Sequence, residues 1–375
     1  YHIKKFKSSF LCIIVVGRAE KMKSEIGSNF WEYDLNKKRK IKFWWESPEF
    51  NKIFLKSGRN AFKAISDNIK VNRKNILFPA YHCETESEPW YENGWKVDYY
   101  SIETDFSVNP EKLEQYILDY NPSVIVIQSY FGFEALNSKC DDVLRKYKNK
   151  GGIIIEDITQ SLISNIRHTV ADYYVASFRK FFAIPDGGVL ISRQIINIDN
   201  IEPSNEELTQ IALKAYDLKK QYFQIKNKSI KDNFRKLYLE LNDLISENDK
   251  LVSMSDIGLE ILNGVDAGEI TERRQQNYKY LYEKLSKINF LYIPRYIEDI
   301  AICPLFLPVL ISENKCREDL QKYLAQNDIY CPIIWKKSHN IEKCSLETQK
   351  IYDHILCFPI DQRYDYDDMQ RIVSV

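Results

Sequence analysis

The chain has 375 residues, 44% of them hydrophobic, so it can bury a substantial core in one large and one smaller domain. Its 53 basic and 53 acidic residues cancel without a long block of one sign, which argues against nucleic acid or an anionic membrane as partner and favours a small substrate. The eight cysteines include no Cys-x-x-Cys pair, so we expect no metal site, no disulfides and a cytoplasmic location.

Residues 1–21 differ in character from the chain that follows. A basic stretch at 2–7 precedes an apolar patch at 10–16, which is too short to span a bilayer. Because Met22 opens a stretch typical of a natural start, we interpret residues 1–21 as a non-native or dispensable extension. A cleaved secretion signal is the alternative, and the unpaired cysteines argue against it.

The first candidate binding site is the run Ser57, Gly58, Arg59 and Asn60. Apolar residues at helical spacing follow it directly, namely Ala61, Phe62, Ala64, Ile65 and Ile69. The run therefore begins a predicted helix, where exposed amides and the helix dipole favour an anion such as phosphate. An ordinary N-cap at Ser57 is the alternative. The phosphate role is favoured when the run is combined with the polar side chains described below.

Short apolar runs alternate with helical segments through the first half of the chain. In chain order, the expected elements are strands at 75–78 and 97–100, a helix near 110–119, a strand at 123–128, a helix near 137–148 and a strand at 152–155. This alternation predicts an α/β fold with a mostly parallel sheet. No Gly-x-Gly-x-x-Gly follows the first strand, so we do not expect a nicotinamide-binding unit.

Three chemically distinct side chains follow the ends of neighbouring predicted strands. Asp157 closely follows the run 152–155, Ser177 ends a run that begins at 172, and Lys180 comes three residues later. Open α/β sheets bind ligands at this edge. The set suits pyridoxal phosphate: the lysine binds the aldehyde covalently, the aspartate keeps the ring nitrogen protonated, and the hydroxyl helps to hold the phosphate.

These residues resemble the motifs of the DegT-type (StrS-like) aminotransferases, which aminate nucleotide-linked keto sugars. The resemblance is carried by Asp157 with Gln160, by Ser177 with Lys180, and by the glycine pair at 187–188. The run at 57–61 and the stretch 76–81 extend it.

The resemblance covers roughly residues 25–200 well and 265–375 loosely. It implies a fold-type I enzyme that uses pyridoxal phosphate and forms a homodimer. It also implies that Lys180 binds the cofactor, that Asp157 contacts the ring nitrogen, and that Gln160 hydrogen-bonds the phenolic oxygen of the ring.

Two departures from the family pattern concern the site itself. Lys180 follows Ser177 by three residues, whereas the family usually spaces them by five. Related enzymes also place an aromatic ring on the face of the cofactor near the position of Cys83, so Tyr81 or His82 would have to serve. An ordinary, hydrogen-bonded loop histidine is the alternative interpretation of His82.

Residues 201–265 form a third departure. They are predicted to be a highly charged, helical connector. The family normally carries an Asn-Tyr-Arg-Met-like loop there, which reaches the neighbouring subunit and helps to bind the sugar nucleotide, and this chain has no such loop. We therefore expect a large cofactor-binding domain at 22–200, the connector, and a small C-terminal α/β domain at 266–375.

The C-terminal domain contributes candidate substrate contacts. Arg363 is a candidate clamp for the carboxylate of an amino-acid donor, because a guanidinium group binds carboxylates through two parallel hydrogen bonds. An ordinary surface arginine is the alternative. Trp335 and His339 are candidates to face the substrate, with a core position as the alternative for Trp335.

Together these features predict an aminotransferase that moves an amino group from an amino acid, glutamate by family habit, to a keto sugar. The resemblance implies a nucleotide-linked sugar and surface-polysaccharide biosynthesis. One alternative is another pyridoxal phosphate reaction such as dehydration, which the retained Lys180 disfavours because related dehydratases carry histidine there. The other is a catalytically lapsed binding protein, which the short Ser177–Lys180 spacing and Cys83 favour.

Overall fold

The computed structural model describes residues 25–375 except 38, 40, 167, 169, 248, 313–314 and 338–343. The predictions for residues 1–21 and for His339 therefore lie outside the described residues. Within the described part, no helix combines the length and the apolar character that crossing a membrane requires.

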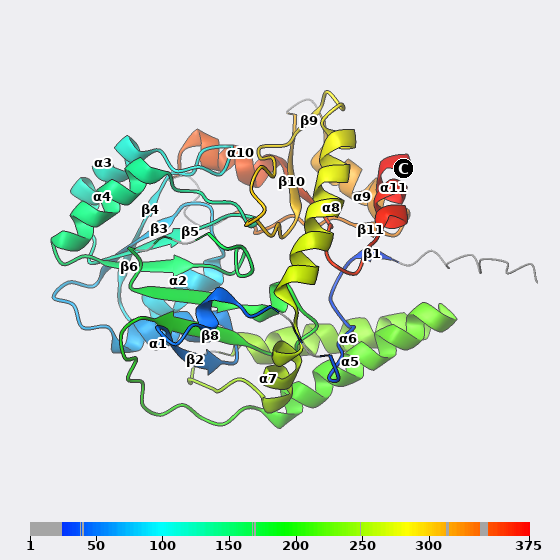
Figure 1. The fold of residues 1–375 in the computed structure, drawn as a ribbon, viewed down its shortest axis with the longest axis horizontal. Coiled ribbons are helices and arrows are strands. Elements are labelled where there is room, and N and C mark those ends of the chain that lie inside the picture. The colour runs from blue at the N-terminus through cyan, green and yellow to red at the C-terminus, as the bar shows by residue number, and fades with distance from the viewer. Residues whose placement is uncertain are drawn as a thin grey trace, which may run out of the picture.

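A seven-stranded sheet forms the centre of the N-terminal half of the chain (Figure 1). The strands lie in the order β2 (Asn51–Leu55), β8 (Gly188–Ser192), β7 (Tyr173–Ser177), β6 (Ile153–Asp157), β5 (Val124–Gln128), β3 (Asn75–Pro79) and β4 (Lys96–Tyr100). Neighbouring strands from β7 to β4 run parallel, whereas β8 runs antiparallel to both β7 and β2. The predicted α/β fold with a mostly parallel sheet is confirmed.

Helices cover both faces of this sheet because alternate residues of each strand point to opposite sides. On β5, Val124 and Val126 share a buried cluster with the first two helices, whereas Ile125 and Ile127 share one with the next two. These helices are α1 (Gly58–Asn68) and α2 (Glu84–Glu92) on one face, and α3 (Pro110–Tyr120) and α4 (Ser138–Asn149) on the other. The short helix η1 (Trp44–Glu46) precedes β2, and η2 (Phe178–Lys180) follows β7.

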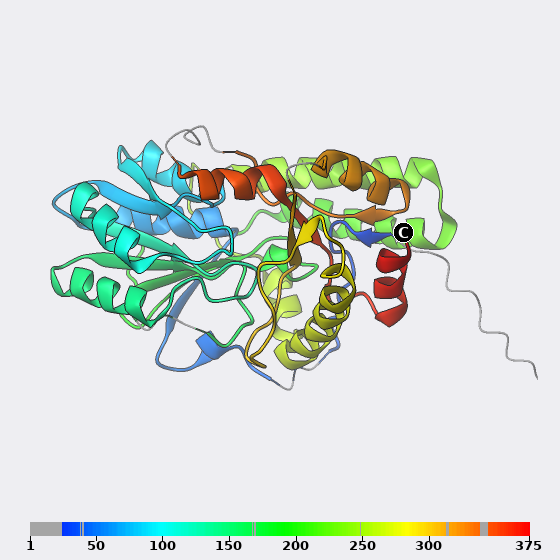
Figure 2. The same ribbon diagram turned by 90° about the horizontal axis from the view of Figure 1, so that it is seen from above.

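A long helical hairpin follows the sheet. It consists of α5 (Glu206–Ile225) and α6 (Lys228–Ser246), and both Figures 1 and 2 show it extending away from the sheet on the side of the C-terminal elements. The hairpin has its own buried cluster, which includes Tyr216, Phe234 and Tyr238. Phe30 and Trp31 from the N-terminal segment pack against that cluster.

The remaining elements form a smaller α/β unit. Its helices are α8 (Ala267–Leu285), α9 (Arg317–Gln326), α10 (Leu346–His354) and α11 (Tyr366–Ser374), and its antiparallel sheet has the order β12 (Ile355–Phe358), β10 (Leu307–Ile311), β9 (Leu291–Tyr292). Helix α7 (Asp256–Asn263) precedes this unit, and its capping residue Ser255 donates hydrogen bonds to Asp186, just before β8. The N-terminal segment joins this unit because β1 (Ile26–Gly27) pairs in parallel with β11 (Ile329–Tyr330).

Glycine at position 188 lets β8 pass directly beside the start of α1. A Cβ atom at Gly188 would lie 2.2 Å from the carbonyl carbon of Ser57 and 2.5 Å from the amide nitrogen of Gly58. Both contacts are with backbone, so no side chain can move aside to relieve them. This close approach sets the position of the α1 N-terminus relative to the ends of β7 and β8.

We predict that Gly188→Ala lowers the free energy of unfolding by about 1–3 kcal/mol, the usual cost of overpacking a rigid site. Gly94→Ala is the control, because no atom lies within 4 Å of its added Cβ. Gly94 has a left-handed φ of +72°, whereas Gly188 does not, so the control measures backbone strain without a steric clash. Denaturant titration of both variants measures the difference. An equal loss in the two variants would contradict the steric explanation.

Candidate active site

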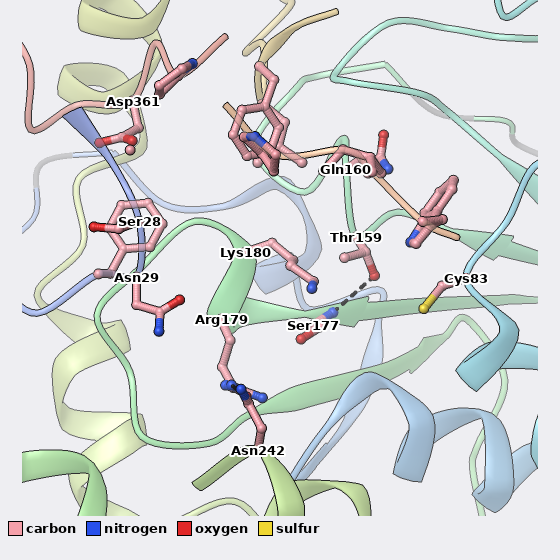
Figure 3. Close-up of a pocket in the computed structure, with 18 of the residues that line it drawn as sticks. Ser28, Asn29, Cys83, Thr159, Gln160, Ser177, Arg179, Lys180, Asn242 and Asp361 are labelled. Carbon is pink, nitrogen blue, oxygen red and sulfur yellow. Dashed lines mark hydrogen bonds between the residues drawn. The ribbon is translucent and has the colours of Figure 1, made fainter. Parts of the chain in front are cut away.

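A pocket of about 930 Å³ lies at the carboxyl ends of β6 and β7, between the large sheet, the last turns of α6 and the C-terminal unit (Figure 3). Eight residues singled out from the sequence line it: Ser57, Gly58, Arg59, Gln160, Ser177, Lys180, Trp335 and Arg363. They come from five separate parts of the chain. The tertiary structure thus brings together most of the predicted set.

The N-terminus of α1 opens into this pocket. Ser57 caps the helix, since its Oγ accepts a hydrogen bond of 3.1 Å from the amide of Asn60. Gly58 lies against the end of β7, where its added Cβ would be 3.3 Å from Cβ of Ser177. The cap and the pocket-lining position are therefore compatible, and the free amides of the first turn remain available to an anion.

The structure places Asn60 differently from the sequence-based expectation. Its side chain is fully buried and outside the pocket lining. Its Nδ2 donates to the carbonyl oxygen of Lys250 at 2.7 Å, and its Oδ1 accepts from the amide of Val252 at 2.9 Å. Asn60 thus ties α1 to the segment that follows the hairpin, a contact that bridges about half of the chain and that no local pattern reveals.

Two guanidinium groups border the α1 N-terminus. Nη1 of Arg59 donates to the carbonyl oxygen of Ser246 at 2.7 Å, and Nη2 of Arg179 donates to Oδ1 of Asn242 at 2.8 Å. Both acceptors lie in the last turns of α6, whose C-terminal carbonyls attract positive charge. No pattern in the sequence indicated a role for Arg179 or for Asn242.

Lys180 is exposed and extends into the pocket from the end of η2, with Thr159 and Gln160 toward one side and Arg179 toward the other (Figure 3). The loop after β6 is joined to β7 beside it, because the amide of Ser177 donates to Oγ1 of Thr159 at 3.2 Å. The spacing of three residues between serine and lysine therefore still brings both side chains to one pocket.

Asp157 ends β6 and is fully buried beneath the pocket. Its Oδ1 accepts a hydrogen bond of 2.7 Å from the amide of Thr159, whereas its Oδ2 is buried and receives no hydrogen bond from any described donor. Burial raises the pKa of Asp157, and the hydrogen bonds from Thr159 and the positive charge of Lys180 act in the opposite direction. A donor placed on Oδ2 would stabilise the ionised form.

Gln160 is the other predicted residue from the loop after β6. Its side chain is 3% exposed and lines the pocket. Its Oε1 accepts a 2.7 Å hydrogen bond from the amide of Phe131. This contact fixes the orientation of the side chain and leaves the amide nitrogen as the group that can donate to a ligand.

Tyr81 and His82 lie in the core rather than at the pocket. Both are fully buried and neither lines the cavity. The hydroxyl of Tyr81 donates to the carbonyl oxygen of Ile334 at 2.8 Å, and His82 Nε2 lies 3.2 Å from Ser87 Oγ. The structure therefore differs from the sequence-based placement of these rings, whereas Cys83 does border the pocket (Figure 3).

Arg363 lines the pocket, but its guanidinium group is already paired. Nε and Nη2 donate to the two carboxylate oxygens of Asp361 at 2.7 and 2.8 Å, and the group lies 4.1 Å from the centre of the Phe30 ring. It also donates to the backbone carbonyls of Ser28 and Asn29. In place of the predicted clamp for a donor carboxylate, Arg363 joins the N-terminal segment to the C-terminal unit.

Arg274 has the free donor that Arg363 lacks. It lines the pocket and is fully buried, and its Nη1 donates to the carbonyl oxygens of Pro304 and Leu305. Its Nη2 has no described hydrogen-bond acceptor. The sequence contained Arg274 within a helical segment, where an arginine most often faces solvent, so only the tertiary structure reveals it.

A scan against protein-family models finds no match, and a search of curated proteins finds none. Solved structures do match. The sugar aminotransferase CalS13 from Micromonospora echinospora superimposes with a TM-score of 0.62 at 13% identity, over 86% of each chain. PseC from Helicobacter pylori, an aminotransferase involved in the biosynthesis of pseudoaminic acid, gives 0.61 at 12% identity, over 92% of this chain and 98% of its own.

A DegT DnrJ EryC1 StrS aminotransferase from Brucella abortus gives a TM-score of 0.60 at 16% identity, over 86% of this chain and 84% of its own. The chain has the fold of these aminotransferases. The fold implied by the sequence resemblance is thereby confirmed. In this chain, the start of α1 and the residues at the ends of β6 and β7 meet at one pocket, which Ser57, Gln160 and Ser177 line.

His82 is buried in the core beneath this edge of the sheet, so the pH dependence of stability tests whether that core keeps it neutral. Burial lowers the pKa of His82 from 6.5 to about 4, so the unfolded chain takes up a proton before the folded one does. Stability is therefore complete above pH 6.5 and is lost as the pH falls toward 4, by up to about 3 kcal/mol from this residue.

We predict that His82→Gln reduces the loss of unfolding free energy between about pH 7.5 and about pH 4.5. His354→Gln, at a half-buried position at the end of α10, is the control. Denaturant titrations at both pH values give the comparison. The same acid sensitivity in wild type and His82→Gln would show that His82 is not held neutral.

Proposed function

We propose that this chain is a pyridoxal phosphate-dependent aminotransferase that transfers an amino group from an amino acid to a keto sugar. The observation that carries the proposal is a buried carboxylate oxygen without a donor, Oδ2 of Asp157, beneath a pocket into which the amine of Lys180 extends. A protonated ring nitrogen is a donor that such an oxygen can accept.

The residues around the pocket fit the cofactor. The amides at the start of α1, with Ser57 and Ser177, would hold its phosphate, and Arg59 and Arg179 supply positive charge at the same end. Gln160 would donate to the phenolic oxygen. When bound, the cofactor supplies an electron sink for the bonds at the carbon that bears the amine.

The protein's own side chains would then transfer protons and stabilise charge. The amine of Lys180 would carry a proton to and from the carbon that gives up or receives the amino group. Asp157, ionised beside the ring nitrogen, would keep the positive charge of that nitrogen in place because opposite charges in a buried site stabilise each other. Cys83 would border the ring where related enzymes place an aromatic residue.

The pocket is large enough to bind an amino-acid donor and then a sugar acceptor, one after the other. Its volume of about 930 Å³ is at the upper end of the range for small-molecule sites, and it extends to Trp335 and the C-terminal unit. The unpaired Nη2 of Arg274 is the candidate contact for the carboxylate of an amino-acid donor such as glutamate. A sugar acceptor is supported by the structural similarity to CalS13, a sugar aminotransferase, and to PseC, an aminotransferase involved in pseudoaminic acid biosynthesis.

A nucleotide-linked sugar, a role in surface-polysaccharide biosynthesis, a cytoplasmic location and a homodimer complete the proposal. In the family, a loop from the neighbouring subunit reaches the phosphate, and this chain lacks its motif. The last turns of its own α6 border the α1 N-terminus instead, through Asn242 and Ser246. The proposed homodimer therefore does not need a partner residue at the phosphate end of the pocket.

We predict that pyridoxal phosphate followed by borohydride labels Lys180 covalently, because reduction makes the bond between the lysine nitrogen and the aldehyde carbon permanent. Peptide mass spectrometry identifies the labelled lysine. Lys180→Ala should abolish the labelling, whereas Lys322→Ala, which removes another exposed lysine of the same pocket, should retain it. Absence of labelling in wild type would favour the lapsed binding protein over either enzyme.

Ser177 tests the phosphate end of the pocket separately. Ser177→Ala should weaken the binding of pyridoxal phosphate about tenfold, the usual effect of losing one hydrogen bond to a charged group. Binding of pyridoxal, which lacks the phosphate, should change little. Equilibrium titration of both compounds provides the ratio, and Ser161→Ala, a buried serine outside the pocket lining, is the control. Equal weakening of both compounds would place the phosphate elsewhere.

A further inference from the structure

Glu86 is a second buried carboxyl group at this pocket. It occupies the first turn of α2, is only 7% exposed, and lines the cavity near Cys83. The backbone amide of Cys83 interacts with the carboxyl group and acts to lower its pKa, against the larger effect of burial. Its Oε2 is buried and receives no hydrogen bond from a described donor.

The unsatisfied oxygen of Glu86 belongs to a pair. The side chains of Glu86 and Asp157 lie within hydrogen-bonding reach of each other, and Oδ2 of Asp157 is likewise a buried carboxylate oxygen without a described donor. Two ionised carboxylates in contact would repel each other in a site that water does not reach. A single proton between the two oxygens removes both the repulsion and the unsatisfied acceptors.

We propose that Glu86 is a protonated acid at neutral pH that donates its proton to Oδ2 of Asp157 and thereby positions Asp157 for the ring nitrogen of the cofactor. The assignment of the ring nitrogen rests on the proposed function. The carboxyl pair itself depends only on residues of this chain.

The chemistry of the pair is consistent with that role. Each carboxylate oxygen can accept two hydrogen bonds, so Oδ2 of Asp157 can receive one from Glu86 and a second from a ligand. The donor from Glu86 leaves the negative charge on Asp157, directly beneath the pocket. Glu86 is therefore a positioning residue, since it acts through Asp157.

The surroundings favour the proton on Glu86. Burial and the charge of Asp157 raise the pKa of Glu86 well above its ordinary value of 4.5. Cys83, Tyr130 and Tyr352 also lie near Glu86, and none of these three groups is a cation. Asp157, by contrast, receives hydrogen bonds from Thr159 and lies within the field of Lys180, so it is the better site for the negative charge.

The first experiment measures melting temperature against pH for the protein without cofactor. Because the folded state raises the pKa of Glu86, the folded protein binds this proton more tightly than the unfolded chain. The contribution of Glu86 to stability is therefore complete below pH 4.5 and is lost as the pH rises through the folded value. Glu86→Gln, which donates at every pH, should gain stability over wild type as the pH rises.

Two further variants make this comparison decisive. Glu92→Gln changes an exposed glutamate of the same helix and should show no such trend. Asp157→Asn removes the neighbouring charge, so Glu86→Gln should gain less in that background. A stability difference between Glu86→Gln and wild type that does not change with pH would show that Glu86 has only a structural role in α2, and it would overturn the proposal.

Infrared spectroscopy of wild type alone should also detect the protonated acid, and its absence at neutral pH would overturn the proposal as well.

The second experiment measures pyridoxal phosphate affinity by titration. Glu86→Gln should bind the cofactor about as well as wild type, because its amide nitrogen replaces the acid as donor to Asp157. Glu86→Ala should bind about tenfold more weakly, since Asp157 loses that donor. Equal affinities for all three proteins would overturn the positioning role. If wild type does not bind the cofactor at all, the proposed function fails, while the melting experiment still tests the carboxyl pair.

Discussion

The structure depends on the close contact between the start of α1 and the ends of β7 and β8. Gly188 allows the backbone of β8 to touch that of Ser57, and Gly58 lies against Ser177. No larger residue fits at position 188, because the atoms it would meet are backbone atoms. Because of this contact, the unpaired amides of α1 face the pocket that Lys180 enters. One steric constraint therefore sets both the packing of α1 against the strand ends and the position of the pocket.

Electrostatics then divides the pocket into two ends. At one end, the dipole of α1 and the guanidinium groups of Arg59 and Arg179 provide positive charge, held in place by the carbonyl and amide oxygens of α6. At the other lie the buried carboxyl groups of Glu86 and Asp157, each with one oxygen that has no described donor. A ligand with an anionic group at one end and a basic nitrogen at the other satisfies both, which is the charge distribution of pyridoxal phosphate.

The helical hairpin explains how one chain can close the positive end of its own pocket. The α5–α6 hairpin is held to the N-terminal segment by Phe30 and Trp31, and that segment is held in turn by Arg363. The predicted connector is therefore also a wall of the site. Arg363 therefore has a structural role, and Arg274 is an arginine of the pocket whose Nη2 has no described hydrogen-bond acceptor.

The sequence by itself determined the parallel strands and the polar residues at their ends, because a buried strand needs a continuous apolar run and the residue after it faces the sheet edge. Asp157, Ser177 and Lys180 were predicted on that basis, and the resemblance rested on the same residues. The tertiary structure alone decided the surroundings of Tyr81, Asn60 and Glu86. Their partners Ile334, Lys250 and Asp157 are far away in the sequence, and local patterns carry no information about contacts that form only when distant segments pack.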